Sequence, residues 1–385
     1  MQNTKLVIGI MSGTSMDGID VVLCRILPHA TKRDEVQFID FLMKPYPPQV
    51  RERLLLLAEG QYGGTREIAL MHALLGELYA DTVEALLTQA GYSASDIDLI
   101  ASHGQTLYHS LEKEHYLGYP IQSSLQLGEA SYLASRFQCL VVSDFRVRDI
   151  AEGGLGAPLV PFVDYALYGS DSENLVYLNI GGISNITYIP RDGKNIIGFD
   201  TGPGNMLIDQ AVVRYSKGEA EYDHDGLLAS QGKVCSELLE KWLAEDYYQQ
   251  APPKNSGREN FGHLKLLAYE EDRKQLGISY LDFIASLTAL TAHCNTRAIK
   301  QFCPETPQRI IVSGGGSRNK TLMGALATLN PESVVESGDV LGYPNDAKEA
   351  LAFAYLGYRT SINKHNNIPQ ATGARKEVIM GKISQ

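Results

Sequence analysis

The chain has 385 residues, of which 44% are apolar and 21% charged, and this length suffices for two domains that each bury a core. Its 34 Lys and Arg against 45 Asp and Glu give a formal net charge of −11. Nucleic acids and anionic membranes attract basic surfaces, and the sequence has no basic run. We therefore expect neither a nucleic acid nor a membrane as a partner.

Further sequence features bear on where in the cell the protein acts. No run of about 18 apolar residues could span a membrane. The N-terminus lacks the basic, apolar and small-residue order of a signal peptide. The five cysteines are scattered without a C-x-x-C pair, which argues against a zinc ribbon or a disulfide framework. These features predict a cytoplasmic protein.

The first half of the chain predicts a hairpin, a long helix and a further strand. Strands over 6–10 and 20–26 flank a polar glycine turn at 12–18. Apolar residues at i, i+3, i+4 spacing predict a helix over 67–87, and a strand over 96–102 follows it.

The second half repeats this order with little residue identity. Its expected elements are strands over 175–180 and 186–189, helices at about 228–246 and 279–302, and a strand over 309–313 that ends in three glycines. Strands that alternate with helices predict α/β layers, and the repeated order predicts two similar domains with a cleft between them. Ligands favour such clefts and the ends of strands.

The turn of the first hairpin combines glycines with hydroxyl side chains. Gly13 and Gly18 allow a tight turn with exposed N–H groups, and Ser12, Thr14 and Ser15 add hydroxyl donors. Converging donors of this kind suit a phosphate oxygen. The segment lacks the Lys-Ser/Thr ending of a P-loop and leads into a strand, so that motif is not supported. A plain hairpin with polar capping residues is the alternative.

Two later glycine turns have related features. Gly181 and Gly182 stand between two strands, as in the first hairpin. The run 314–316 passes from a strand to a helix that Ser317 or Asn319 would cap. Three successive glycines let a flat ring or a ribose approach the main chain closely, although an ordinary strand-to-helix connection would also contain glycine.

Asp200 stands between an apolar strand and a Gly-Pro-Gly bend. An ionised carboxylate at such a bend could accept a proton from a hydroxyl or a water, or hold Mg²⁺ through water. A simple turn aspartate is the alternative interpretation.

Neutral donors and arginines occur in two further segments. His103 and Gln105 lie in Ser-His-Gly-Gln-Thr, and Arg146 and Arg148 lie in Asp-Phe-Arg-Val-Arg-Asp. Arginine pairs with carboxylates and phosphates, but a surface ion pair would use the same residue. No Gly-x-Ser-x-Gly elbow and no histidine metal motif occurs, so neither a serine hydrolase nor a histidine-bound metal is predicted.

Taken together, these motifs resemble the anhydro-N-acetylmuramic acid kinase family over nearly the whole chain. The motifs that carry the resemblance are residues 9–20, 102–106, 144–146, 153–161, 179–185, 199–205, 254–259 and 314–316. The resemblance implies an α/β fold with two similar RNase H-like lobes of the hexokinase, heat-shock chaperone and actin superfamily, and an ATP cleft between them. We expect an N-terminal lobe of residues 1–140 plus about 365–385, and a C-terminal lobe of about 141–364.

The resemblance also implies the reaction. Such an enzyme would use ATP and Mg²⁺ to hydrolyse the 1,6-anhydro bond of anhydro-N-acetylmuramic acid and phosphorylate O6, giving N-acetylmuramic acid 6-phosphate and ADP in cell-wall recycling. Its partner would be this small-molecule sugar, and a homodimer is a candidate assembly. An ordinary sugar kinase of the same superfamily is the first alternative, and a chaperone-like ATPase switch is the second.

Site residues are implied in the same way. The ATP-binding residues would be Gly13, Thr14, Ser15, Met16, Asp17, Gly18, Ile19, Asp20, Gly181, Gly182, Gly314, Gly315 and Gly316. Asp200 would be the catalytic base, and Arg148, Glu349, His103 and Gln105 would contact the substrate. Met11 and Asn179 stand where many superfamily members carry an aspartate, so we assign no direct Mg²⁺ ligand and expect contacts through water, phosphates, and Asp200 or Asp17.

Overall fold

A computed structural model describes residues 4–13, 16–30, 33–60, 63–110, 112–170, 172–252, 254 and 256–385. The chain divides into two compact units, Met1–Tyr168 with Gly342–Gln385, and Gly169–Leu341. Each unit has a mixed sheet with helices, so the predicted α/β class is confirmed.

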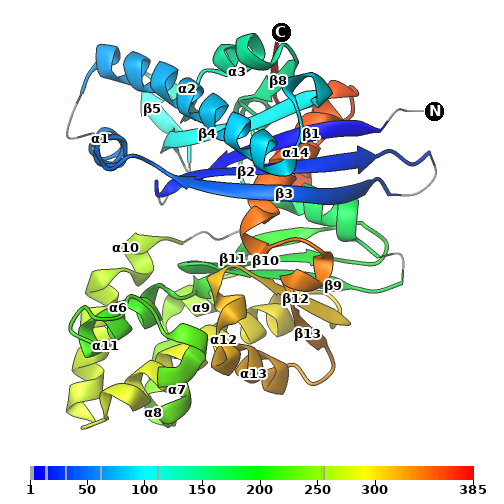
Figure 1. Cartoon of the computed structure of the whole chain (residues 1–385). Coiled ribbons are helices and arrows are strands. Elements are labelled where there is room, and N and C mark those ends of the chain that lie inside the picture. The colour runs from blue at the N-terminus through cyan, green and yellow to red at the C-terminus, as the bar shows by residue number, and fades with distance from the viewer. Residues whose placement is uncertain are drawn as a thin grey trace. The chain divides into compact units, whose positions relative to one another are not determined.

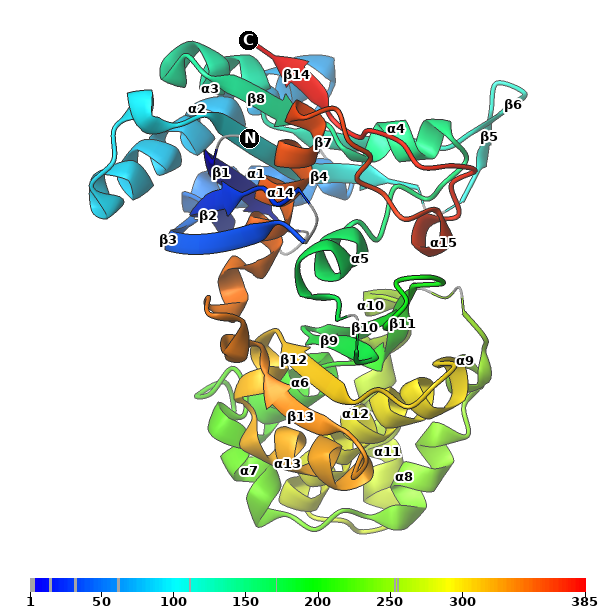
Figure 2. The same ribbon diagram turned by 90° about the vertical axis from the view of Figure 1, so that its right-hand side faces the viewer.

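The first unit is built on one seven-stranded sheet. Its strands are β1 (Lys5–Ser12), β2 (Gly18–Leu27), β3 (Glu35–Pro45), β4 (Leu99–His109), β7 (Ser124–Leu127), β8 (Leu140–Ser143) and β14 (Lys382–Ser384). They follow the order β14-β8-β4-β1-β2-β3, and β7 pairs with β4. A separate hairpin of β5 (Glu114–Tyr116) and β6 (Tyr119–Ile121) extends away from this sheet (Figure 2).

Helices cover both faces of this sheet. The helices of this unit are α1 (Pro48–Ala58), α2 (Thr65–Ala90), α3 (Ala130–Phe137), α4 (Arg146–Ala151), α5 (Val160–Val163), α14 (Lys348–Ser361) and α15 (Pro369–Thr372). Because successive residues of a strand point to opposite faces, Ile8 and Ile10 join the core with Leu75 of α2, whereas Gly9 faces Ala350 of α14. Figure 1 shows α2 in front of the sheet and α14 behind it.

The second unit has a five-stranded sheet. Its strands are β9 (Leu175–Ile180), β10 (Ile183–Ile189), β11 (Ile197–Pro203), β12 (Arg309–Ser313) and β13 (Val334–Ser337), in the order β11-β10-β9-β12-β13. Its helices are α6 (Met206–Tyr215), α7 (Leu227–Gln231), α8 (Ser236–Leu243), α9 (Asp246–Gln249), α10 (Arg258–Phe261), α11 (His263–Gln275), α12 (Tyr280–Phe302) and α13 (Lys320–Leu329). Helix α12 supplies buried residues along its whole length and crosses the core of this unit.

The two sheets share one topology. In each, an antiparallel run of three strands (β1-β2-β3 and β9-β10-β11) is extended on the other side of its first strand by two parallel strands (β4-β8 and β12-β13). The predicted pair of similar RNase H-like lobes is therefore confirmed by strand order and direction.

One helix and the lobe boundaries differ from the sequence-based expectation. The helix expected over 228–246 is divided into α7 and α8, because a Cβ at Gly232 would lie 2.1 Å from the carbonyl oxygen of Leu281, so the chain there runs against α12 as an extended segment. The first unit reaches Tyr168 and resumes at Gly342, because β8 pairs with β4 and α14 packs on β1. The expected boundaries near 140 and 365 would have placed both elements in the other lobe.

In the part of the chain that the structure describes, no helix is long and apolar enough to cross a membrane.

Candidate active site

The first glycine turn connects β1 to β2 and is held from two sides. The carbonyl of Gly13 accepts hydrogen bonds from the Met16 N–H (3.2 Å) and from Nε2 of Gln105 on β4 (2.9 Å). Met16 has a φ of 53° and a side chain buried in the core. The main chain at Asp17 accepts the N–H of Tyr46, which follows β3 (3.1 Å). Thr14 and Ser15, also expected in this turn, lie outside the described residues.

Beneath this turn lies a small polar network. The hydroxyl of Tyr46 donates to Oγ of Ser12 (3.0 Å) and lies 3.3 Å from Oε1 of Gln105. Ser12 and Gln105 are almost fully buried, and burial raises the pKa of the Tyr46 hydroxyl. The predicted residue Gln105 therefore reaches the first turn and fixes its backbone.

Carboxylates gather around the start of β2 and the start of α14. Asp20 lies directly across from Met11 in the β1–β2 register, so both side chains share one face of the sheet. Burial, together with the charges of Asp17, Glu349 and Asp346, raises the pKa of Asp20 to about 7. Such mutual repulsion favours a cation or a proton at this place.

His103 on β4 and Arg146 on α4 form a second group in the first unit. Nε of Arg146 donates to Nε2 of His103 (3.0 Å), and its Nη1 donates to the carbonyl of Gly156 (2.7 Å). Burial and the Arg146 charge hold the pKa of His103 well below its usual range, so the imidazole is neutral. Burial lowers the pKa of Arg146 to about 10, although the charge of Glu349 opposes this shift. The structure thus groups His103 and Glu349 with Arg146, which sequence reasoning did not select.

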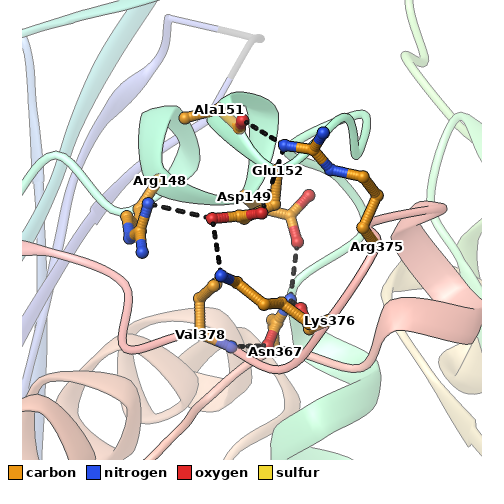
Figure 3. A network of polar contacts seen from close by, with 8 residues as sticks. All are labelled: Arg148, Asp149, Ala151, Glu152, Asn367, Arg375, Lys376 and Val378. Carbon is orange, nitrogen blue, oxygen red and sulfur yellow. Dashed lines mark hydrogen bonds and ion pairs between the residues drawn. The ribbon is translucent and has the colours of Figure 1, made fainter.

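Arg148, the arginine that was selected, belongs to a different network (Figure 3). Its Nη1 donates to Oε1 of Glu152 (3.2 Å), and half of its side chain is exposed. Arg375 and Lys376 from the C-terminal segment pair with the same carboxylate. The helical repeat explains the difference, because residues two apart on α4 face different directions.

In the second unit, the two later glycine turns lie together. A Cβ at Gly316 would meet the side chain of Ile180 at 2.4 Å, and a Cβ at Gly314, whose φ is 76°, would meet the Ile180 carbonyl at 2.6 Å. Nδ2 of Asn205 donates to the same carbonyl (3.3 Å). Asn319 caps α13 by accepting the N–H of Leu322 (2.9 Å), so the predicted cap is confirmed for Asn319.

The bend after β11 closes onto the second turn. The N–H of Asn205 donates to the Gly181 carbonyl (2.7 Å), and the N–H groups of Gly204 and Met206 donate to the Gly182 carbonyl (2.9 and 3.1 Å). A Cβ at Gly204 would lie 2.2 Å from the Gly181 carbonyl oxygen, which explains the glycine after Pro203. The Gly-Pro-Gly bend therefore brings α6 onto the second turn, and Asn205, the last residue of the motif 199–205, contacts that turn.

Asp200 lies within β11 rather than after the strand, and it is partly buried. Its carboxylate oxygen Oδ2 accepts the Ser256 N–H (2.8 Å), its N–H donates to the Lys254 carbonyl (3.1 Å), and its carbonyl accepts the Tyr247 hydroxyl (3.0 Å). Lys254 and Ser256, which belong to one of the motifs that carry the family resemblance, thus both contact the candidate base.

The described residues include no group of three or more side chains arranged to hold a metal ion. Mg²⁺ commonly keeps several waters and binds through one or two carboxylates together with substrate phosphates. Asp17 and Asp20 beside the first turn offer such carboxylates, and the pKa of Asp20 is raised by burial first and then by the charges of Asp17, Glu349 and Asp346.

Comparison with known proteins places these features in a family. The family model for anhydro-N-acetylmuramic acid kinase matches residues 5–385. The chain is 42% identical over 384 residues to the anhydro-N-acetylmuramic acid kinase of Caldanaerobacter subterraneus subsp. tengcongensis, covering 99% of this chain and 97% of the relative. It is 40% identical over 393 residues to that of Francisella tularensis subsp. novicida, with full coverage of both.

Solved structures give weaker likenesses. The activator of the 2-hydroxyisocaproyl-CoA dehydratase from Clostridium difficile with bound ADPNP matches with a TM-score of 0.44 and 10% identity, covering 93% of this chain and 96% of that chain. A ROK family glucokinase from Streptomyces griseus in complex with glucose and AMPPNP matches with a TM-score of 0.37 and 14% identity, covering 92% and 99%. On its match to the family model and to full-length relatives, the chain belongs to the anhydro-N-acetylmuramic acid kinase family.

Proposed function

We propose that this protein is an ATP-dependent kinase that opens anhydro-N-acetylmuramic acid with water and transfers phosphate to O6, with Asp200 as the general base. The assignment of the base rests on the hydrogen bond that fixes the Asp200 carboxylate. Its Oδ2 is fixed by the Ser256 N–H at 2.8 Å, in the unit whose Gly181–Gly182 and Gly314–Gly316 turns adjoin one another. A fixed carboxylate can remove a proton from a positioned water without a reorganisation cost.

The proposed reaction joins two steps. The Asp200 carboxylate accepts a proton from water as the water oxygen bonds to C1, and the C1–O6 bond breaks. The electron pair of that bond remains on O6, which attacks the γ-phosphorus as the bond to ADP breaks. The products are N-acetylmuramic acid 6-phosphate and ADP, and the proton on Asp200 passes to solvent. Ring opening thus creates the nucleophile that an ordinary kinase must obtain by deprotonating a hydroxyl.

We assign phosphate and adenosine binding to the glycine turns. In the first unit these residues are Gly13, Thr14, Ser15, Met16, Asp17, Gly18, Ile19 and Asp20. In the second unit they are Gly181, Gly182, Gly314, Gly315 and Gly316. The network of Ser12, Tyr46 and Gln105 supports this assignment, because it holds the first turn in place before any ligand binds. Asp17 and Asp20 would hold Mg²⁺ through water, and the bound ion would neutralise charge on the transferring phosphoryl group.

Sugar binding is assigned to His103, Gln105, Arg148 and Glu349. The neutral imidazole of His103 suits hydrogen bonding to a sugar. Arg148 has a half-exposed guanidinium that could pair with the lactyl carboxylate of a muramic acid. Arg146 supports this group through its hydrogen bond to His103.

We further propose a cytoplasmic enzyme of cell-wall recycling that assembles as a homodimer. The β5–β6 hairpin supports an assembly, because Tyr116, Leu117 and Tyr119 there are 66%, 81% and 69% exposed. Clustered exposed apolar side chains are typical of protein–protein contacts.

Asp200→Asn tests the function most directly. The amide keeps the shape but cannot accept the proton, so kcat should fall by about 10²–10⁴-fold while the KM values change far less. In H₂¹⁸O the wild-type product should carry the label on the anomeric hydroxyl and none on the phosphate, as read by mass spectrometry. Unlabelled product would show that water does not open the ring, and a near-normal kcat for Asp200→Asn would remove Asp200 from the role of base.

A further inference from the structure

Lys254 is a buried lysine beside the candidate base. Lys254 is 7% exposed, and burial lowers the pKa of its ammonium. It forms no ion pair with any residue that the structure describes. Buried lysines without an acidic partner are uncommon, because transfer of a charge from water into protein is costly. A specific set of contacts must compensate for that cost at this position.

Aromatic rings and one carbonyl provide these contacts. The ammonium lies 4.6 Å from the ring centroid of Tyr247, 5.5 Å from that of Phe302 and 5.9 Å from that of Phe199. All three distances are within the range of a cation–π interaction. Its Nζ also donates to the main-chain carbonyl of Tyr247 (3.1 Å). The aromatic cage, defined as the rings of Phe199, Tyr247 and Phe302, therefore holds a cation that also binds the backbone.

These contacts close a ring of hydrogen bonds around Asp200. The Asp200 N–H donates to the Lys254 carbonyl (3.1 Å), Nζ of Lys254 donates to the Tyr247 carbonyl (3.1 Å), and the Tyr247 hydroxyl donates to the Asp200 carbonyl (3.0 Å). Two residues beyond Lys254, the Ser256 N–H holds Oδ2 of Asp200 (2.8 Å). Lys254 and Ser256 therefore both contact Asp200, one through its main-chain carbonyl and the other through its N–H.

We propose that Lys254 is a positioning residue for Asp200: its ammonium holds Lys254 against the aromatic cage and the Tyr247 carbonyl, so that the Ser256 N–H keeps the Asp200 carboxylate in the orientation that accepts the proton from water. This proposal rests on the proposed role of Asp200 as the base. Lys254 acts through Asp200 and needs no contact with either substrate.

Lys254→Met removes the charge and the donor but keeps the length of the side chain. An apolar side chain among aromatic rings packs well, and replacement of a buried charge by a hydrophobic residue is often neutral or stabilising. We therefore expect an unchanged or raised melting temperature. Since a misplacement of about 1 Å in an active site can cost about 10²-fold, kcat should fall by roughly 10–100-fold, with both KM values changed less than about 3-fold. A purely structural lysine would show the opposite pattern.

Tyr247→Phe removes the hydroxyl that donates to the Asp200 carbonyl, so it breaks the same ring of hydrogen bonds at a different bond and keeps Lys254. It should lower kcat in the same direction, and it carries the test if Lys254→Met does not fold. Lys265→Met is the matched control, because Lys265 also lies over an aromatic ring (Tyr269, 5.4 Å) and pairs with Glu245 (2.8 Å), yet shows no contact with Asp200 or Lys254. Its kcat should equal that of the wild type.

The decisive measurement is a double-mutant cycle with Asp200→Asn, read as the rate of phosphorylated product by mass spectrometry. If Lys254 acts through Asp200, Lys254→Met should cause little further loss in the Asp200→Asn background. Losses that multiply in the double mutant would overturn the proposal, as would a normal kcat in both Lys254→Met and Tyr247→Phe while Asp200→Asn is inactive. A normal kcat in Asp200→Asn itself would instead reject the proposed base.

Discussion

The packing of β1 against α14 gives the sharpest prediction of stability. A Cβ at Gly9 would lie 1.9 Å from the carbonyl oxygen of Ala350 and 2.9 Å from Cβ of Ala354. Because ordinary contacts begin at about 3.4 Å, Gly9→Ala forces strand and helix apart by about 1.5 Å. The nearest atom belongs to helix backbone, so no side-chain rotation can relieve the overlap.

The expected cost follows from this geometry. Overpacking of a close-packed interior costs about 1–3 kcal/mol, and a backbone clash lies at the upper end of that range. For a unit of this size the melting temperature changes by about 2–4 °C per kcal/mol, so Gly9→Ala should lower it by roughly 6–12 °C. Glu349 immediately precedes Ala350 at the start of α14, so the same shift should raise the KM for the sugar.

Thermal unfolding followed by circular dichroism measures this effect, with sugar-dependent ADP release as the activity assay. Gly324→Ala is the matched control, because Gly324 lies inside α13 and a Cβ added there would have no atom within 4 Å. Alanine there should stabilise the helix by about 0.5–1 kcal/mol. A Gly9→Ala variant that melts within about 1 °C of the wild type would refute the reasoning.

Two further predictions concern charge. The pKa of Asp20 is about 7 in the folded chain against an ordinary value of 3.8, so the folded state binds this proton more tightly and loses stability as pH rises from about 4 to 7. Without nucleotide, Asp20→Asn should therefore melt higher than the wild type at pH 8, and this difference should vanish near pH 4; a pH-independent difference would contradict it. Arg146→Met removes the donors to His103 and Gly156, which should cost about 1.5–3 kcal/mol of stability and lower kcat/KM for the sugar at least as much as Arg148→Met does. Equal melting temperatures for Arg146→Met and the wild type would count against it.

Features with a local signal could be predicted from the sequence. The hairpin strands, the three glycine turns and the helices over 67–87 and 279–302 match β1, β2, β9, α2 and α12 closely, since turn chemistry and apolar periodicity act within a few residues. Gly91, with a φ of 75°, is the left-handed residue that follows α2. The repeated order of elements also predicted the two lobes.

The site was predictable only in part. Asp200, His103 and Gln105 stand in short motifs whose chemistry indicates a role. Lys254 also stands in a motif, but its role depends on an aromatic cage with two rings that lie far from it in the sequence. Arg146 and Arg148 have the same chemistry, and only the family resemblance favoured Arg148. The direction of each side chain on α4 decided that Arg146 joins His103 and that Arg148 joins Glu152.

The α/β class, the repeated hairpin-and-turn order and the family follow from the sequence alone, because local patterns and short motifs encode them. The edges of the sheets and the lobe boundaries depend instead on contacts between distant segments. Strand β14 (Lys382–Ser384) has three residues and no local signal, yet it pairs with β8, far away in the chain (Figure 2). Likewise, the carboxylate of Asp200 is fixed by Ser256, which lies 56 residues later. Such contacts form when burial brings distant segments together, and their energy belongs to the pair and to neither segment alone.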